Sequence, residues 1–287
     1  MDKFNVQAFD DIGDKFKAYE KQYTDIIPFD IDKPIVARLD GCHFSSWTSK
    51  YTEDDDRLPY STKMNTAMQN TTKYLMEQTG ATIGYTTSDE ITLIWFKYEE
   101  KSQMFYNGKT AKLMSTLASM ASVKFYEEYS KKYNDVIYDL PYFDCRIFKL
   151  DSNKDAIMNM CWRIQDAYRN SISRTAQKFF SHKQLLNKNC NSKLEMLKDI
   201  KYEYHKLPLE FICGSVYGKV KKFRSFSSEE IQLLPEKHTA RLDPNYVCER
   251  AEIEMLTDIF HFFDYMKLES NFTKWLEIFK QLQIVKE

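Results

Sequence analysis

Two aspartates stand where neighbouring strands are expected to end and to begin. Asp40 follows the apolar run 34–39 and precedes Gly41, and Asp89 comes just before the apolar run 91–98. Mg²⁺ prefers carboxylate oxygens and commonly combines one or two of them with substrate phosphates. Asp40, the Gly41 carbonyl and Asp89 are therefore candidate ligands for two Mg²⁺ ions, an arrangement suited to phosphoryl transfer. The alternative is that both are ordinary turn aspartates.

Lysines at an expected helix start form a second candidate site. Lys109 and Lys112 follow Gly108 and are three residues apart, so they share one helix face. Together with the exposed amides of a helix start they are suited to binding a triphosphate. A Walker A loop is excluded because its first glycine would fall at position 103, which is Gln103. The alternative is a solvated lysine pair.

A third group lies on an expected long helix. Arg163, Asp166 and Asn170 recur at helical spacing along one side. Arginine binds phosphate through two hydrogen bonds, and Asn or Asp can bind base edges or ribose hydroxyls. The alternative is pairing of Asp166 with Arg163 or Arg169 within the helix.

Positive charge is concentrated in the middle of the chain. Residues 149–224 contain 16 Lys and Arg against 7 Asp and Glu, although the whole chain has a formal net charge of -1. A basic segment on a weakly acidic chain suggests a surface for a polyanion. Near its end a basic strand or loop is suited to an RNA backbone, with Lys219, Lys221, Lys222 and Arg224 as the candidate contacts. The alternative is a solvated helical surface.

The elements that position these residues follow from hydrophobic periodicity. Strands are expected at 34–39, 81–86, 91–98 and 142–150, with helices from about 59 to Gly80 and from about 109 to 125. Their order is β-α-β-β-α-β, the ferredoxin-like unit, in which the first strand lies antiparallel to the third. Asp40 should then lie beside Asp89 and Glu90.

The second half of the chain is expected to be rich in helices, at about 153–180, 249–266 and 271–283. The predicted fold class is therefore α+β, with residues 1–150 as the catalytic core and residues 151–287 as a helix-rich region packed on it.

Composition excludes several classes of protein. A hydrophobic fraction of 43% and a charged fraction of 29% are typical of an ordered globular chain. The six cysteines form no CxxC pair, and we expect reduced thiols in a cytoplasmic protein with no membrane span. The histidines form neither HxH nor HExxH and there is no GxSxG, so the sequence offers no motif of a zinc or serine hydrolase.

Taken together, five segments resemble the tRNA-histidine guanylyltransferase family, in particular its guanylyltransferase-like branch, which extends RNA in the 3′ to 5′ direction. They are VARLDG at 36–41, GYTTSDEITLIWF at 84–96, NGKTAKLMSTLAS at 107–119, FDCRI at 143–147 and WRIQDAYRNS at 162–171. The resemblance spans about residues 16–222. It implies a polymerase-type palm, two Mg²⁺ ions, ATP or GTP for activation, NTP substrates, a tRNA lacking 5′ nucleotides and a homotetramer.

The resemblance also implies roles for individual residues. Asp40, Asp89 and Glu90 would be catalytic, with Asp40, Gly41 and Asp89 as the metal ligands. The residues implied in nucleotide binding are Gly41, the amides of Cys42, His43 and Phe44, Ser88, Lys109 and Lys112. Activation and binding of the RNA 5′ end would involve Arg163, Asp166, Arg169, Asn170 and Lys193.

Several positions depart from the family pattern. Cys42 replaces an arginine, Ser61 an aspartate, Tyr168 a frequent histidine and Leu194 an asparagine. Ser45 also departs near the first strand, and Ile212 and Cys213 stand where a basic pair is common. The metal ligands are retained, so the departures concern activation and tRNA docking. The lack of a His-Ile-Asn-Asn segment favours template-dependent repair over addition of one guanine to tRNA-histidine.

Two competing functions remain at this stage. One is a catalytically weak RNA-binding relative that retains the palm. The other is a nucleotide cyclase, which would share the metal aspartates but would not need the basic segment.

Overall fold

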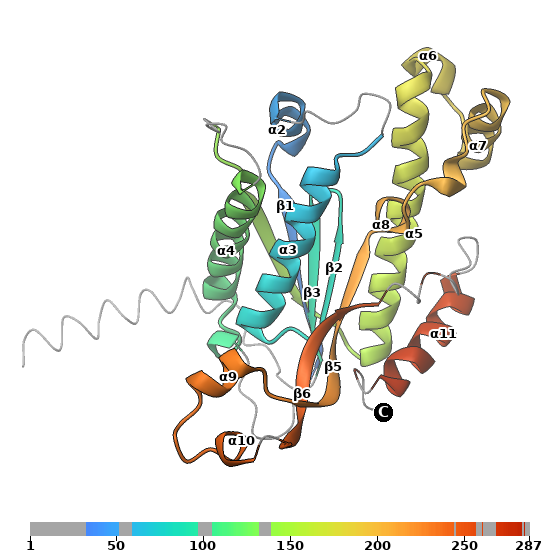
Figure 1. Cartoon of the computed structure of the whole chain (residues 1–287). Helices are drawn as coiled ribbons and strands as arrows, with labels where there is room; N and C mark the ends of the chain where they lie inside the picture. The colour runs from blue at the N-terminus through green and yellow to red at the C-terminus, as the bar shows by residue number, and fades with distance from the viewer. Residues whose placement is uncertain are drawn as a thin grey trace, which may run out of the picture.

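The protein is built around one six-stranded antiparallel sheet with the strand order β4-β1-β3-β2-β5-β6 (Figure 1). The structure is a computed structural model and describes residues 33–51, 59–96, 105–131, 139–243, 245–256, 260, 268–282 and 284. The first half contributes β1 (Ile35–Gly41), α2 (Phe44–Tyr51), α3 (Thr62–Thr79), β2 (Ile83–Thr87), β3 (Glu90–Trp95), η1 (Phe105–Gly108), α4 (Thr110–Ser130) and β4 (Phe143–Lys149). The α+β class is confirmed.

Strand pairing in this half is the arrangement predicted from the element order. β1 lies antiparallel to β3, with Asp40 opposite Glu90, and antiparallel to β4 on its other side. The short helix α2 was not predicted, because its polar sequence had been interpreted as a loop.

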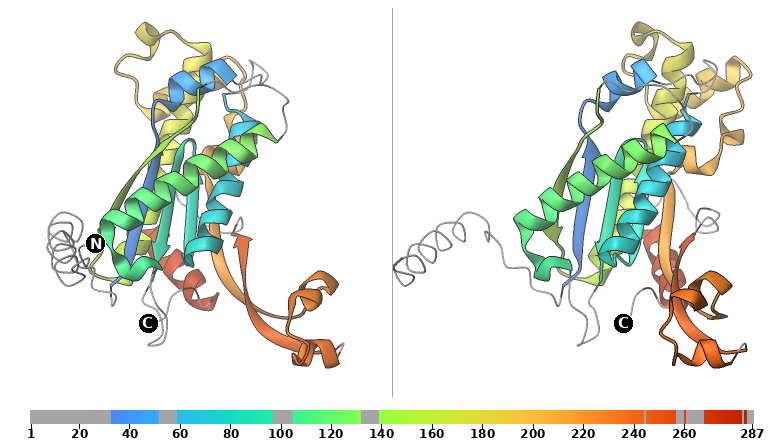
Figure 2. Two further views of the ribbon diagram at one scale, coloured as in Figure 1. Left: turned by 90° about the vertical axis from the view of Figure 1, so that its left-hand side faces the viewer. Right: turned by 60° about the vertical axis from the view of Figure 1, so that its left-hand side comes forward.

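Helices cover both faces of the sheet (Figure 2). Alternate strand residues point to opposite faces, so Ile35, Ala37 and Leu39 pack with α3 and α4. Val36 and Ile94 belong to the other core, with α5 and α11. By the same alternation Asp40 and Glu90 lie on the α5 face, at the end of the sheet next to α2.

Helix ends follow local capping rules. Ser61 caps the start of α3 by accepting a hydrogen bond from the Met64 amide, and Gly80 ends it in the left-handed conformation with φ 71°. Ser152 caps α5 by accepting from the Asp155 amide. These caps fix where α3 and α5 begin. Ser61 at the start of α3 lies near Ser88 and the candidate site, whereas α5 begins at the opposite end of the sheet, after the end of β4 that pairs with Ile35.

The second half adds helices and two strands. It contains α5 (Asn153–Phe179), α6 (His182–Leu185), α7 (Cys190–Asp199), η2 (Tyr204–Lys206), α8 (Leu209–Ile212), β5 (Ser215–Ser225), α9 (Ser228–Leu233), α10 (Thr239–Leu242), β6 (Val247–Met255) and α11 (Leu268–Gln281). β5 pairs with β2, so this half completes the sheet of the first.

The helix predicted at 249–266 is wrong over its first part, which is β6. Its Glu, Ala and Met residues favour a helix, but pairing with β5 along nine positions from Tyr217 to Ser225 overrides that preference. The remainder of that prediction lies largely outside the described residues. Among the described helices, none is long and apolar enough to cross a membrane.

Candidate active site

Asp40, Gly41 and Asp89 meet at one end of the sheet. The Gly41 amide donates a hydrogen bond of 3.0 Å to the Asp89 carbonyl, and Asp40 lies directly opposite Glu90. The structure thus brings together the two aspartates that the sequence separates by 49 positions. This adjacency is the geometric basis of the candidate site.

A third carboxylate, which the sequence interpretation missed, faces the same point. Asp144 on β4 lies opposite Asp40 in the strand register. The pKa of Asp40 is raised first by burial and then by the negative charges of Asp89 and Asp144, while Arg146 and Arg38 act in the opposite direction. The signal was present in the FDCRI segment, because a fourth strand beside the first puts Asp144 next to Asp40.

This electrostatic environment fits a divalent cation. Carboxylates whose negative charges lie close together are stabilised when a cation neutralises them. No group of three or more His, Cys, Asp or Glu side chains within the described residues is arranged to hold a metal ion by itself. Asp40, the Gly41 carbonyl and Asp89 instead supply the partial oxygen set that Mg²⁺ completes with water and phosphate.

Gly41 is required by the close approach of an aromatic ring. A Cβ at Gly41 would lie 2.4 Å from Cδ2 of Phe44, a ring that packs against Phe125 and Phe143. The backbone turns sharply here, with His43 at φ 57°. The Cys42 amide donates to the Tyr142 carbonyl, whereas those of His43 and Phe44 have no acceptor among the described residues. Two of the three amides predicted to bind a triphosphate are thus available to do so.

Gly41→Ala is expected to lower the free energy of unfolding by about 1–3 kcal/mol, because the buried Phe44 ring has to move. Chemical denaturation would measure this loss. The double variant Gly41→Ala/Phe44→Leu should be less destabilised than the sum of its two single changes. Strict additivity would show that the contact between Gly41 and Phe44 is not the cause.

Glu90 is held in a largely buried ion pair with Arg163. Arg163 Nε and Nη2 donate to the two Glu90 carboxylate oxygens at 2.8 and 2.6 Å, and both side chains are only 12–13% exposed. Arg163 Nη1 also donates to Asp166 Oδ2 at 3.3 Å, to which Asn170 Nδ2 donates at 3.2 Å. Burial raises the pKa of Glu90, and the hydrogen bonds from Arg163 oppose that rise. Arg163 therefore connects α5 to the carboxylate end of the sheet.

The other residues predicted for activation lie on or beside α5. Arg169 Nη2 is 3.9 Å from Asp166 Oδ1. Lys193 on α7 donates to Ser173 Oγ on α5 at 2.9 Å. Ser88, predicted to bind nucleotide, lies next to Asp89 in the β2–β3 turn with φ 53°. The roles predicted for Arg169, Lys193 and Ser88 stay predictions.

Lys109 and Lys112 lie toward the opposite end of the sheet from the aspartates. The carboxyl-terminal part of α4 reaches the Gly41 end, where Ser122 accepts from the Phe143 amide and Phe125 contacts Phe44. At 1.5 Å per residue Lys112 is about 20 Å farther along the helix axis than Phe125. Lys112 Nζ instead lies 4.3 Å from the centre of the Tyr106 ring. One chain therefore does not bring these lysines to its own aspartates.

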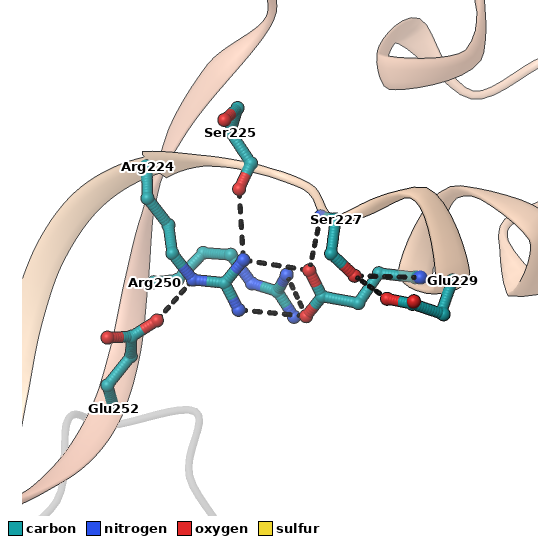
Figure 3. A network of polar contacts seen from close by, with 7 residues as sticks. Arg224, Ser225, Ser227, Glu229, Arg250 and Glu252 are labelled. Carbon is teal, nitrogen blue, oxygen red and sulfur yellow. Dashed lines mark hydrogen bonds and ion pairs between the residues drawn. The ribbon is translucent and has the colours of Figure 1, made fainter.

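Three basic residues of β5, Lys221, Lys222 and Arg224, are paired with acidic residues. Lys221 lies 3.2 Å from Glu249, and Lys222 pairs with Glu254, both on β6. Arg224 pairs with Glu230 of α9 at 2.7 Å and with Glu252 of β6, and Arg250 shares Glu230 (Figure 3). Lys219 donates its amide to Thr82. The positive segment is thus partly neutralised by the strand that the sequence interpretation had taken for a helix.

The positions that depart from the family pattern have structural contacts. Ser61 caps α3. The Tyr168 ring lies 6.2 Å from that of Tyr204, and Leu194 packs at the edge of the core beneath α5. Cys42, beside Asp144, has its pKa raised by burial and by that carboxylate.

Comparisons with known proteins identify the family to which this chain is similar. The model of the tRNAHis guanylyltransferase (Thg1) family matches residues 13–151. A bacterial tRNA(His) guanylyltransferase (Thg1)-like protein solved in complex with ATP is 34% identical, with a TM-score of 0.64 over 72% of this chain and 86% of that one. Its complex with GTP gives 31% identity and a TM-score of 0.58, over 72% and 85% of the two chains.

Curated relatives are more distant. A protein of Acanthamoeba polyphaga mimivirus, named as uncharacterised, is 28% identical over 66% of this chain and 70% of its own. The tRNA(His) guanylyltransferase of Schizosaccharomyces pombe is 27% identical over 55% of this chain and 58% of its own length, which is less than two thirds.

Proposed function

Because the chain belongs to the tRNAHis guanylyltransferase (Thg1) family, we propose that it is a Mg²⁺-dependent nucleotidyltransferase that adds nucleotides to the 5′ end of tRNA in the 3′ to 5′ direction. The observation that carries the proposal is the meeting of Asp40 and Asp89 beside the Gly41 backbone. The unit from β1 to β4 would be the palm, with residues 1–150 as the catalytic core. Residues 151–287 would bind and activate tRNA.

The reaction has two balanced steps. In the first, an oxygen of the tRNA 5′-monophosphate attacks the α-phosphorus of ATP or GTP, and pyrophosphate leaves as the nucleotidylated 5′ end forms. In the second, the 3′-hydroxyl of an incoming NTP attacks the 5′ phosphorus of the tRNA. AMP or GMP leaves, the hydroxyl proton is lost, and the added nucleotide keeps its triphosphate.

The protein's contribution is to position groups and balance charge. Asp40, the Gly41 carbonyl and Asp89 would hold two Mg²⁺ ions, which when bound neutralise phosphate charge and polarise the attacking and leaving oxygens. The amides of His43 and Phe44 would donate to a triphosphate beside this point. Arg163 would keep Glu90 ionised and in place, while Asp166, Asn170 and Arg169 would line the path of the RNA 5′ end.

Other parts of the proposal concern partners. Lys109 and Lys112 would bind a triphosphate only if they lay near Asp40 and Asp89 of a second copy of the chain. A homotetramer would allow this arrangement. Template-dependent repair is the proposed role, because the chain lacks the His-Ile-Asn-Asn segment.

Sizing of the RNA product tests the function. The protein would be incubated with a 5′-truncated, 5′-monophosphorylated tRNA, Mg²⁺, ATP and labelled NTPs. We expect a lengthened tRNA in which the missing 5′ nucleotides have been restored. RNA of unchanged length, in a preparation that still binds ATP, would contradict the proposal.

The basic strand gives a salt-dependence prediction. If β5 contacts phosphates, Lys221→Ala/Lys222→Ala should flatten the slope of log K against log salt by up to about 2, since each neutralised phosphate contributes about 0.9. Glu249→Gln/Glu254→Gln should strengthen tRNA binding, because it frees the same lysines. Filter binding from low to high salt would measure both. Slopes equal to that of the unaltered protein in both variants would leave β5 without a role in RNA binding.

A further inference from the structure

Arg174 is a partly buried arginine without a counterion in contact. It lies on α5, and its guanidinium makes no hydrogen bond or ion pair in the described part of the chain, whereas Arg163 on the same helix pairs with Glu90 and Asp166. Its recorded contact is the ring of Phe211, whose centre is 5.9 Å from Cζ. Burial lowers the pKa of Arg174, and the charge of Asp89 opposes that effect. Arginine stays charged in proteins, so this charge is suited to an incoming anion.

A cavity of about 50 Å³ opens beside Arg174. It is lined by Ser61 and Asn65 at the start of α3, by Ser88 in the β2–β3 turn and by residues of α8. Ser88 is the neighbour of Asp89, so the cavity adjoins the candidate metal site. The sequence interpretation missed Arg174, because only the fold brings α3, the turn, α5 and α8 together.

The lining has the chemistry of a nucleotide site. A guanidinium binds phosphate oxygens in pairs, and hydroxyl and amide groups add donors. The rings of Tyr60 and Phe211 lie 4.4 Å apart and give an apolar wall. Glu210, which makes no ion pair with Arg174, supplies an acceptor suited to a ribose hydroxyl.

We propose that Arg174 binds a phosphate group of a nucleotide in this cavity, beside the Asp89 end of the metal site. The phosphate would come from the RNA 5′ end or from the activating nucleotide. This inference rests on the proposed function and adds a phosphate-binding residue to it.

Binding measurements on the full chain test the assignment without relying on turnover. The probes are an RNA oligonucleotide with a 5′-monophosphate, the same RNA with a 5′-hydroxyl, and ATP. Arg174→Gln would be compared with Lys154→Gln, which removes one positive charge from an exposed position on the same helix. Fluorescence anisotropy would follow RNA, and calorimetry would follow ATP.

Arg174→Gln should lower the affinity for one of the phosphate ligands by about 10- to 150-fold, the range expected for lost charge-assisted hydrogen bonds. If the RNA end is bound, the preference for 5′-monophosphate over 5′-hydroxyl disappears. If the activating nucleotide is bound, the affinity for ATP falls instead. Lys154→Gln should leave both unchanged.

Folding of the variant is informative as well. Removing a partly buried charge that has no counterion in contact should leave the melting temperature unchanged or raised. Arg174→Lys should bind with intermediate affinity, because it keeps the charge but loses the planar fork. All three probes bound by Arg174→Gln as by the unaltered protein would overturn the assignment. A second outcome would also overturn it. In that outcome Arg174→Gln lowers the melting temperature, Arg174→Lys restores it, and neither variant changes the affinity for the phosphate probes.

The two proposals fail differently. If the unaltered protein lengthens tRNA while Arg174→Gln binds every probe normally, only the role of Arg174 is lost. If the unaltered protein does not lengthen tRNA at all, the proposed function is lost whatever Arg174 binds.

Discussion

Replacing Asp40 or Asp89 with asparagine is expected to reduce the rate of nucleotide addition by about 10³-fold or more. Each change removes a charge from the site proposed to hold Mg²⁺, and loss of ~4 kcal/mol of transition-state stabilisation corresponds to this factor. Single-turnover addition to a 5′-monophosphorylated tRNA would measure it.

The fold should survive these changes. The charges of Asp40, Asp89 and Asp144 oppose one another, so asparagine at either position should change the free energy of unfolding by no more than about 0.5 kcal/mol. Asp199→Asn, at the exposed end of α7, is the matched control and should keep full activity. Addition at the normal rate by either site variant would refute the metal assignment.

Breaking the Glu90–Arg163 pair is expected to have the second large effect. Arg163→Met leaves the Glu90 carboxylate partly buried without its bidentate partner. Removal of one member of a buried pair typically costs about 3–5 kcal/mol, which denaturant unfolding would detect.

The double variant Arg163→Met/Glu90→Gln separates stability from chemistry. Without a stranded charge it should regain most of the lost stability. Its rate of nucleotide addition should stay low, because the Glu90 carboxylate, opposite Asp40 in the sheet, is lost from the proposed catalytic site. Full recovery of both quantities would show that the pair is only structural, and equal destabilisation of the single and double variants would contradict the charge argument.

The first half of the fold was predictable because short-range patterns and chain direction agree there. The apolar runs around Ile35 and Ile91 identify β1 and β3, and the handed crossover makes them neighbours. The sequence alone therefore places Asp40 and Asp89 together. Asp144 follows from the same logic applied to the fourth strand.

The position of Lys109 and Lys112 was also implicit in the element order. β3 starts at the aspartate end and runs away from it, so a helix that follows β3 begins at the far end and returns. The residues at the helix start indicate only a local phosphate site, and the direction of the chain determines at which end of the sheet that site lies.

Ion pairs between residues far apart in the chain could not be predicted from the sequence. Nothing in the residues around Glu90 indicates that Arg163, 73 positions later, takes both of its oxygens. The same holds for β6, where Glu249 and Glu254 favour a helix locally but pair with lysines of β5 in the fold. Charge counted along the chain therefore overestimated the exposed positive surface.

Addition in the 3′ to 5′ direction can be read from the fate of the γ-phosphate of the incoming nucleotide. The protein would be given a 5′-monophosphorylated tRNA that lacks a single 5′ guanosine, unlabelled ATP, Mg²⁺ and GTP labelled at the γ position. Addition at the 5′ end keeps the triphosphate of the last nucleotide, so we expect label in lengthened tRNA, and none with Asp40→Asn. Lengthened tRNA without label, with the label released in pyrophosphate, would mean ordinary 3′-end addition and would contradict the account.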